Sequence, residues 1–359
     1  MRVFRGLPNP ASRTPCALTI GNFDGVHRGH RALIERVRGA ADRLGVAACV
    51  MTFEPHPREY FHARLLAEGR LDDPTSKPPA RIANLRDKLD ALAACGVDRV
   101  IVERFNARFA SLSAEHFIED LVVAGCHARW LMVGDDFRFG AQRRGGFAML
   151  EDAGERCGFE VETLPSVTTP SARSAPDGDA AADAVPDERV SSSAIRAALA
   201  AGDLARAERL LGHPYFISGH VIHGAKLGRT IGFPTANILP LGHAKDRQVA
   251  LSGIFVVRVH GAADEPVPGV ASLGVRPTVE DAGRVLLEVH LFDFASSLYG
   301  KRLRVEFLHK LRNEEKYDDL ARLTAAIAAD ARAARAWFGA ADDAPFGERP
   351  PTSATDRIT

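Results

Sequence analysis

The chain has 359 residues, more than one typical domain needs and enough for two domains with separate hydrophobic cores. Lys and Arg together number 46, as do Asp and Glu, so the formal net charge is zero and no overall basic field attracts nucleic acid or an anionic membrane. The sequence contains no run of about 18 apolar residues, so no membrane span is expected, and its first residues lack the apolar core of a secretory signal.

The first half alternates strand-like and helix-like segments. A short apolar run at 17–20 ends in a Gly-Asn-Phe-Asp-Gly turn, and apolar residues from Leu33 to Leu44 then recur at helical spacing. The other predicted elements are strands at 46–53, 98–103 and 129–133 and helices at 83–95 and after the capping residue Ser113. This alternation predicts an α/β Rossmann-like domain with a doubly wound parallel sheet.

The composition changes at 167–188, which is rich in Ala, Asp, Pro and Ser and has almost no large apolar residues. We interpret this stretch as a mobile insertion within the first domain. A helical segment at 192–211 follows it and closes that domain, which we assign to residues 1–212.

After Gly212 the pattern changes to short strands separated by glycine turns. The strand-like segments are 254–259, 285–292 and 303–308. They predict a small antiparallel β-barrel, assigned to residues 213–340. A C-terminal helix is predicted at 316–338, with Leu320, Leu323, Ile327 and Ala331 on one face. Residues 341–359 are polar and Pro-rich and are predicted to be a disordered tail.

Five cysteines are scattered along the chain, and none forms a Cys-x-x-Cys pair. They are Cys16, Cys49, Cys95, Cys126 and Cys157. An odd number at irregular spacing argues against a disulfide framework and against a zinc site, so a reducing cytoplasm is the expected location.

The most specific motif is GNFDGVHRGH at 21–30, which follows a strand and opens a helix. That is where α/β proteins bind phosphates, and glycines there let the backbone approach a ligand closely. His27 and His30 are three residues apart and therefore share a helix face. Two imidazoles at that point are suited to hold a triphosphate and to stabilise charge that develops when its α-phosphate is attacked, an effect worth about 3–4 kcal/mol per donor.

HxGH in this setting is the signature of the nucleotidyltransferase superfamily, which class I aminoacyl-tRNA synthetases share. The longer motif resembles the adenylyltransferase domain of bacterial bifunctional FAD synthetases, as do VGDDFRFG at 133–140 and RVSSSAIR at 189–196. The resemblance implies that His27 and His30 are catalytic and bind ATP phosphates. It also implies a nucleotide and flavin site formed by Gly21, Asn22, Phe23, Asp24, Gly29, Asp136, Arg189, Ser192, Ser193 and Arg196.

The RVSSSAIR motif also has a physical rationale of its own. Serine hydroxyls and free N–H groups at a helix start, beside arginines with a planar guanidinium, are suited to phosphate. Ser193 stands where the family usually has Thr, which keeps the hydroxyl. Taken alone, a Ser triplet is more often a helix cap, and His56 is more often structural than part of a site.

The second domain carries GHVIHGAKLGRTIGFPTAN at 219–237, which resembles the signature of riboflavin kinases. Thr235 and Asn237 are two apart in extended chain and point the same way. Their hard neutral oxygens suit Mg²⁺ that ATP phosphates already hold. The glycines of this segment are suited to wrap a nucleotide. The predicted cofactor-binding residues are Gly224, Lys226, Gly228 and, from the LRNEEKY segment of the same resemblance, Arg312.

Glu288 is the candidate general base of the second domain. Val285, Leu287, Val289 and Leu291 share one strand face, and Glu288 lies on the other with Leu286, His290 and Phe292. A carboxylate on a partly buried face needs a compensating role, and removing a proton from the ribityl 5′-hydroxyl of riboflavin is one. An outward-facing surface glutamate is the alternative.

These observations predict two enzymes on one chain: a riboflavin kinase and an FMN adenylyltransferase, using Mg²⁺, ATP and the flavins riboflavin, FMN and FAD. The partners expected are these small molecules, without nucleic acid or membrane; an oligomer is compatible with the sequence but not predicted. Two alternatives stay open: a riboflavin kinase with an inactive first domain, and a flavin-binding regulatory protein. A tRNA synthetase is disfavoured because no KMSKS-like segment or basic surface is found.

Overall fold

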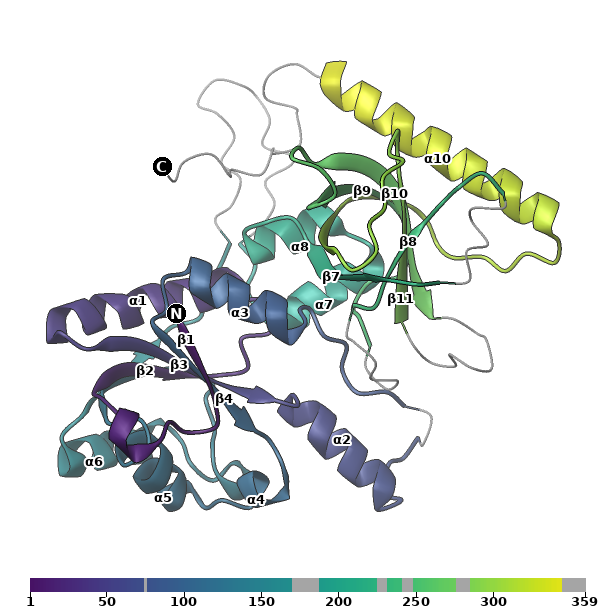
Figure 1. Ribbon diagram of the computed structural model, residues 1–359. Coiled ribbons are helices and arrows are strands. Elements are labelled where there is room, and N and C mark those ends of the chain that lie inside the picture. The colour runs from purple at the N-terminus through teal and green to yellow at the C-terminus, as the bar shows by residue number, and fades with distance from the viewer. Residues whose placement is uncertain (74–75, 170–186, 225–230, 241–247, 276–284, 344–359) are drawn as a thin grey trace, which may run out of the picture. The chain divides into compact units, whose positions relative to one another are not determined.

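The computed structural model describes residues 1–73, 76–169, 187–224, 231–240, 248–275 and 285–343 (Figure 1). Its contacts divide the chain into two compact units. The first unit contains Met1–Pro79 and Leu85–Ser192, and the second contains Ala80–Asn84 and the chain from Ser193 onward. The predicted mobile insertion lies outside the described residues apart from 167–169 and 187–188. Of the predicted disordered tail, 341–359, residues 341–343 are described and are helical, and the rest lies outside the described residues.

The first unit is built on a six-stranded sheet in which every pairing is parallel. Its strands are β1 (Arg2–Arg5), β2 (Cys16–Ile20), β3 (Ala47–Glu54), β4 (Arg99–Arg104), β5 (Ala128–Gly134) and β6 (Glu160–Leu164), in the order β1-β4-β3-β2-β5-β6. Its α-helices are α1 (Arg28–Leu44), α2 (Pro57–Ala67), α3 (Leu85–Ala94), α4 (Ala107–Ala110), α5 (Ala114–His116) and α6 (Phe147–Cys157). This topology confirms the predicted doubly wound α/β fold.

The alternation of side chains along each strand produces two cores, one on each face of the sheet. Ala17, Val50 and Trp130 pack with the apolar faces of α1 and α3. Leu18 and Leu131 point the other way and pack with the segment after Ser113 and with α6. Figure 1 shows α1 and α3 on one side of the sheet and α5 and α6 on the other.

The order in which the chain adds strands to the sheet reverses at β2. Strands β3 and β4 are added on one side of β2, and β5 and β6 are added on the other side. In open α/β sheets ligands bind outside the carboxyl ends of the strands at such a switch point. The carboxyl end of β2 leads into GNFDG, and that of β5 leads into Asp135 and Asp136. The fold therefore brings two of the predicted motifs to one position.

The second unit is a closed antiparallel barrel with helices outside it. Its strands are β7 (Phe216–Ile222), β8 (Ala236–Ile238), β9 (Gly253–His260), β10 (Val267–Val275), β11 (Val285–Leu291) and β12 (Arg302–Arg312), in the order β10-β11-β8-β7-β12-β9. Its helices are α7 (Ser192–Ala201), α8 (Leu204–Leu211) and α10 (Leu320–Asp343). The predicted barrel and C-terminal helix are confirmed.

Side-chain alternation on β11 matches the prediction: Val285, Leu287, Val289 and Leu291 are all buried. On the outer face, Phe292 packs with Ala331 and Ala334 of α10. The predicted apolar face of α10 is right for Ala331 but wrong for Leu320, whose exposed fraction is 53%. Leu320 begins the helix, and the helix residues that pack in the apolar cluster lie further along, from Ala331 to Phe338.

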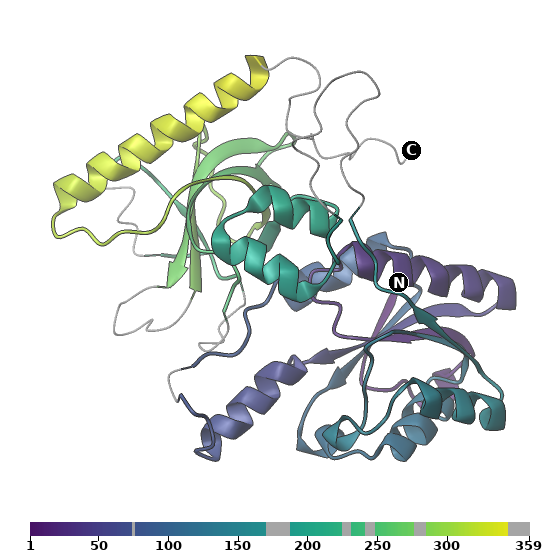
Figure 2. The same cartoon turned by 180° about the vertical axis from the view of Figure 1, so that it is seen from behind.

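The units divide at Ser192–Ser193, whereas the sequence places the domain boundary at 212. Helices α7 and α8 are grouped with the barrel, and both figures show α8 beside its strands (Figures 1 and 2). The apolar face of α8, with Leu204, Ala207, Leu210 and Leu211, is buried. The second unit also includes Ala80–Asn84, since Asn84 Nδ2 donates to the carbonyl oxygens of Ser218 and Pro240. In the described part of the chain, no helix is both long and apolar enough to cross a membrane.

Candidate active sites

The turn between β2 and α1 has a strained backbone. Phe23 and Val26 have φ angles of 48° and 40°, and Gly25 has a φ angle of 85°. Non-glycine residues in this region cost about 1–3 kcal/mol each and persist only where the surroundings hold them. Here the side chains of Phe23 and Val26 are almost completely buried in the core beneath the turn. The apolar residues of GNFDGV thus fix the backbone of the predicted phosphate site.

The two histidines of the motif lie together at the start of α1, as their spacing predicts. Their rings are stacked with centroids 3.6 Å apart and planes at 15°. His27 is the N-cap, because its Nδ1 accepts a hydrogen bond from the backbone N–H of His30 at 3.3 Å. A Cβ at Gly29 would come within 3.3 Å of the His27 ring, so the glycine of HxGH leaves room for the imidazole.

Burial, then His27, then the positive charge of Lys88 lower the pKa of His30 well below its ordinary value. The Nδ1 atom of His30 is buried and makes no hydrogen bond within the described chain. The imidazole is therefore neutral at pH 7 and available to a ligand. Placing positive charge on two stacked imidazoles in one buried site is unfavourable. The positive charge that faces a triphosphate must therefore come from other groups.

The lowered pKa predicts how stability depends on pH. Below about pH 6.5 an unfolded chain protonates this histidine, whereas the folded chain does not. The free energy of unfolding should therefore be constant above that pH and should fall as the pH decreases through the window below it. Urea titrations at several pH values measure this slope. A His30→Gln variant should have a smaller slope in the same window, and an equal slope would contradict the assignment.

The other two motifs of the first unit meet beside this turn. Arg189 lies 3.6 Å from Asp135 and 3.9 Å from Asp136. Its backbone position is fixed because Thr168 and Arg189 form an antiparallel bridge. Ser192 Oγ donates to the carbonyl oxygen of Asp24 at 3.2 Å. Thus GNFDG, GDD and RVSS form one constellation, although GNFDG is more than 100 residues from the other two motifs in the sequence.

Other predicted residues have different surroundings. Ser193 and Arg196 belong to the second unit, where Arg196 Nε donates to the carbonyl oxygen of Ala80 at 2.6 Å. Their predicted phosphate contacts remain a prediction. His56 caps α2 by accepting from the N–H of Arg58, which agrees with a structural role.

Sequence reasoning missed an aromatic cluster at the carboxyl ends of β3 and β4. Tyr60 and Phe61 of α2 make edge contacts with Phe105, with ring centroids 5.4 and 5.6 Å apart. The ring of Phe53 continues the cluster, and the exposed fraction of Phe61 is 43%. The available signal was the dipeptide Tyr60–Phe61 shortly after a strand end, which sequence reasoning left unused.

In the second unit, the PTAN motif and Glu288 lie on neighbouring strands. Asn237 of β8 pairs directly with Glu288 of β11, so their side chains project from the same face, with Cβ atoms about 5 Å apart. Asn237 is buried, and its Oδ1 has no hydrogen-bond partner in the part of the chain that the structure describes. A buried amide oxygen left open in this way is suited to bind a cation.

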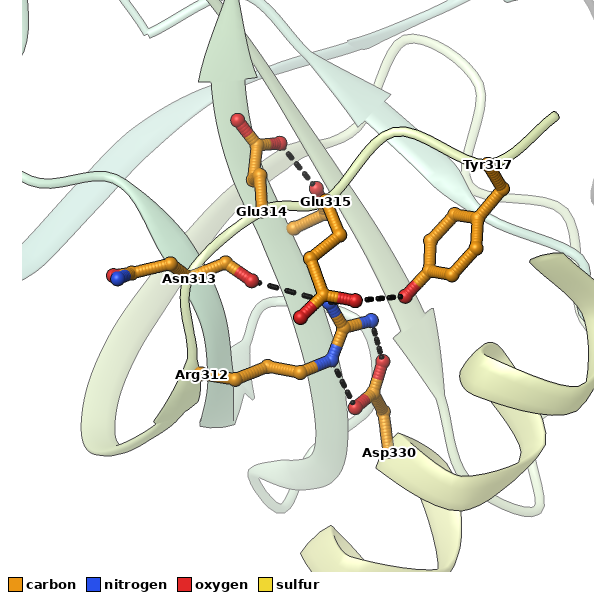
Figure 3. A network of polar contacts seen from close by, with 7 residues as sticks. Arg312, Asn313, Glu314, Glu315, Tyr317 and Asp330 are labelled. Atoms are coloured by element: carbon orange, nitrogen blue, oxygen red, sulfur yellow. Dashed lines mark hydrogen bonds and ion pairs between the residues drawn. The ribbon is translucent and has the colours of Figure 1, made fainter. Parts of the chain in front are cut away.

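A third strand extends this row, because Ser272 of β10 pairs with Glu288 from the other side. Ser272 Oγ donates to Glu314 at 2.9 Å, and Figure 3 shows Glu314 above the barrel strands. The candidate base thus lies between an amide and a hydroxyl on a three-strand surface.

Arg312 lies in a network of polar contacts with α10 (Figure 3). Its guanidinium makes a bidentate pair with Asp330 at 2.9 and 2.7 Å, and this pairing raises the pKa of Arg312. Tyr317 lies beside it, with the guanidinium carbon 5.9 Å from the ring centroid. The predicted contact between Arg312 and the flavin stays a prediction. Lys226 and Gly228 lie outside the described residues.

Gly224 lies against the Asn237 amide. A Cβ at this position would come within 2.5 Å of Asn237 Nδ2 and 2.8 Å of Oδ1. We therefore expect Gly224→Ala to displace the amide and to lower phosphorylation by about tenfold or more, since misplacing a site by 1 Å costs up to 100-fold. The control is Gly339→Ala, because a Cβ there meets nothing within 4 Å. Equal rates for the two variants would contradict the role of Asn237.

Comparison with known proteins identifies a family for each of the two halves of the chain. Residues 9–175 match the FAD synthetase family, and residues 211–338 match the riboflavin kinase family. The chain is 46% identical over 342 residues to the bifunctional riboflavin kinase/FMN adenylyltransferase of Escherichia coli strain K12, covering 94% of this chain and 98% of the relative. The protein of the same name from Haemophilus influenzae is 45% identical, covering 94% of this chain and 99% of the relative.

A solved structure has a similar fold over nearly the whole chain. It comes from Streptococcus pneumoniae, where it is described as a macrolide-efflux protein, and it is 27% identical with a TM-score of 0.68. The match covers 94% of this chain and 100% of the other. With two family matches and relatives that align almost end to end, the chain belongs to the bifunctional riboflavin kinase/FMN adenylyltransferase family.

Proposed function

We propose that this chain phosphorylates riboflavin with ATP to give FMN and then transfers AMP from a second ATP to FMN, giving FAD and pyrophosphate. The observation that carries the proposal is that two separate constellations lie in different units. His27 and His30 belong to the first unit, and Asn237 and Glu288 to the second.

For the kinase reaction, we assign to Glu288 the removal of the proton from the ribityl 5′-hydroxyl as its oxygen attacks the γ-phosphorus of ATP. ADP is the leaving group. Thr235 and Asn237 would hold Mg²⁺, and the open, buried Oδ1 of Asn237 supports that fit. The metal would neutralise charge on the phosphates. The position of Asn237 directly opposite Glu288 supports joining metal and base in one site.

For the adenylyl transfer, a phosphate oxygen of FMN attacks the α-phosphorus of ATP and pyrophosphate leaves. The neutral imidazoles of His27 and His30 and the N-terminal N–H groups of α1 would donate to the phosphate oxygens as charge develops. Arg189 would contribute a planar pair of donors. The approach of Arg189 to Asp135 and Asp136, and the bond from Ser192 to Asp24, support a role beside the same turn.

The aromatic cluster of Tyr60, Phe61 and Phe105 supplies an apolar surface in the first unit. A flavin ring system is a large planar aromatic, and such rings gain about 0.5–1.5 kcal/mol from an aromatic neighbour beyond burial. The exposure of Phe61 supports this cluster as the place that receives the isoalloxazine ring.

We propose the cytoplasm as the location, because both reactions consume ATP. The partners proposed are the small-molecule substrates alone.

The direct test supplies the purified chain with Mg²⁺, ATP and either riboflavin or FMN, and separates the products by chromatography. We expect FMN and then FAD from riboflavin, and FAD from FMN. FMN formation without FAD formation would favour the alternative in which the first domain is inactive. No turnover of either flavin would favour a binding protein and would overturn the proposal.

A further inference from the structure

A lysine is buried beneath the turn of the first unit. Lys88 of α3 is 3% exposed, and within the described part of that unit it is the one buried Lys or Arg side chain. Burying an ammonium group is costly unless it is paired or hydrogen-bonded. Lysines are therefore rarely buried without a role, and the apolar packing of α3 does not require one here.

The ammonium is connected to the turn through a threonine. Lys88 Nζ donates to Thr52 Oγ1 at 3.3 Å. The hydroxyl of Thr52, which is completely buried in β3, donates in turn to the backbone carbonyl oxygen of Asn22 at 3.1 Å. An ammonium group can only donate hydrogen bonds, so the Thr52 oxygen accepts from Lys88. The single proton of the Thr52 hydroxyl is then donated to the Asn22 carbonyl oxygen. This chain of two hydrogen bonds holds the first residue of the turn after Gly21.

The same ammonium acts electrostatically on the histidine pair. The charged or titratable groups that act on His30 are His27 from its own helix and Lys88 from α3. Asp24 of the turn and Asp87 of α3 are also buried and have interactions of their own. Of the groups that lower the pKa of His30, Lys88 is the cationic one.

We propose that Lys88 is a positioning residue of the adenylyl-transfer site: its ammonium fixes the Asn22 carbonyl through Thr52 and supplies, from beneath the turn, the fixed positive charge toward which the triphosphate binds. The inference rests on the proposed adenylyltransferase activity. Its consequence is that His27 and His30 remain neutral hydrogen-bond donors while Lys88 provides the charge.

Two variants separate the charge from the hydrogen bond. Lys88→Met removes both, and Lys88→Gln keeps an amide donor for Thr52 while removing the charge. We expect both to lower the rate of FAD formation from FMN by about 10- to 100-fold and to leave FMN formation from riboflavin within about twofold. The exposed Lys77, also in the first unit, provides the matched control Lys77→Met.

The decisive measurement is the pKa of His30. Without the nearby positive charge this pKa should rise, although burial and His27 still lower it, and a pH titration followed by NMR of the imidazole protons detects the rise. A rate of FAD formation that falls with no change in the His30 pKa would reduce Lys88 to a structural role and overturn the inference.

Two further outcomes are distinguishable. If the unchanged chain forms no FAD from FMN and ATP, the proposed adenylyltransferase activity fails rather than the role of Lys88. If the unchanged chain forms FAD and both variants match it, the inference about Lys88 fails alone. If Lys88→Met loses its fold, as seen from the loss of a cooperative urea transition of the first unit, Lys88→Gln provides the same measurements with the hydrogen bond retained.

Discussion

We expect the Glu288→Gln variant to lose riboflavin phosphorylation by about 10²–10⁴-fold, the usual contribution of a general base, while FAD formation from supplied FMN continues at the original rate. Glutamine keeps the size and shape of the side chain but cannot accept the hydroxyl proton. Since Glu288 pairs with Asn237 in the barrel and the adenylyl-transfer residues lie in the other unit, the loss should be confined to one reaction. Steady-state rates with riboflavin and with FMN measure both activities.

The matched control for this variant is Glu265→Gln. Glu265 is an exposed glutamate between β9 and β10, in the same unit. We expect both of its activities to be unchanged. If Glu288→Gln kept its kinase rate within a few-fold, Glu288 would be an ordinary strand glutamate and the base would have to be another group.

The second large effect is expected from the histidine pair. Replacing His30 by Gln or His27 by Asn should lower FAD formation by about 10²–10³-fold, the cost of losing one donor to a developing charge, without lowering FMN formation. His27 also caps α1, and Asn is among the best capping residues. His27→Asn therefore removes the imidazole while retaining the cap, whereas His27→Ala removes both.

This pair of His27 variants separates catalysis from stability. His27→Ala should lower the free energy of unfolding by about 1 kcal/mol relative to His27→Asn, while both lose FAD formation to a similar degree. His116→Ala, at an exposed histidine of the same unit, is the control. Near-normal FAD formation by His27→Asn would show that the histidine serves only as a cap.

Much of this arrangement could be predicted from local sequence. Alternating apolar runs and glycine turns indicated the parallel sheet and the barrel, because side-chain periodicity is a local property. Neighbouring residues also suffice to predict that HxGH lies at a helix start and which residues of β11 face inward. The spacing of His27 and His30 predicted that the rings share a face, and the structure confirms it as a stacked pair.

The remaining features depend on contacts between distant segments. The pairing of Asn237 with Glu288 follows from strand order in the barrel, and no pattern within either strand specifies it. Strand β8 has only three residues; extended chain was predicted there, but not its strand partners. The burial of Lys88 could not be predicted for the same reason. A lysine on a helix is normally exposed to solvent, and its hydrogen-bond partner Thr52 is 36 residues away in the sequence.

The two compact units divide at a different residue from the predicted domain boundary, because α7 and α8 follow the first domain in sequence but are grouped with the barrel by their contacts. The bond from Arg196 to Ala80 and the bonds from Asn84 join distant segments within the second unit. Local propensity identified these helices but contains no information about which core they complete.

The central claim, that one chain carries out both transfers, is tested most directly by following isotopic label from ATP. The chain is incubated with riboflavin, Mg²⁺ and ATP labelled either at the γ-phosphate or at the α-phosphate. We predict that γ-label appears first in FMN and is retained in FAD, whereas α-label appears in FAD and never in FMN. Absence of α-label from the flavin products, while γ-label enters FMN, would contradict the account by leaving the chain with the kinase reaction alone.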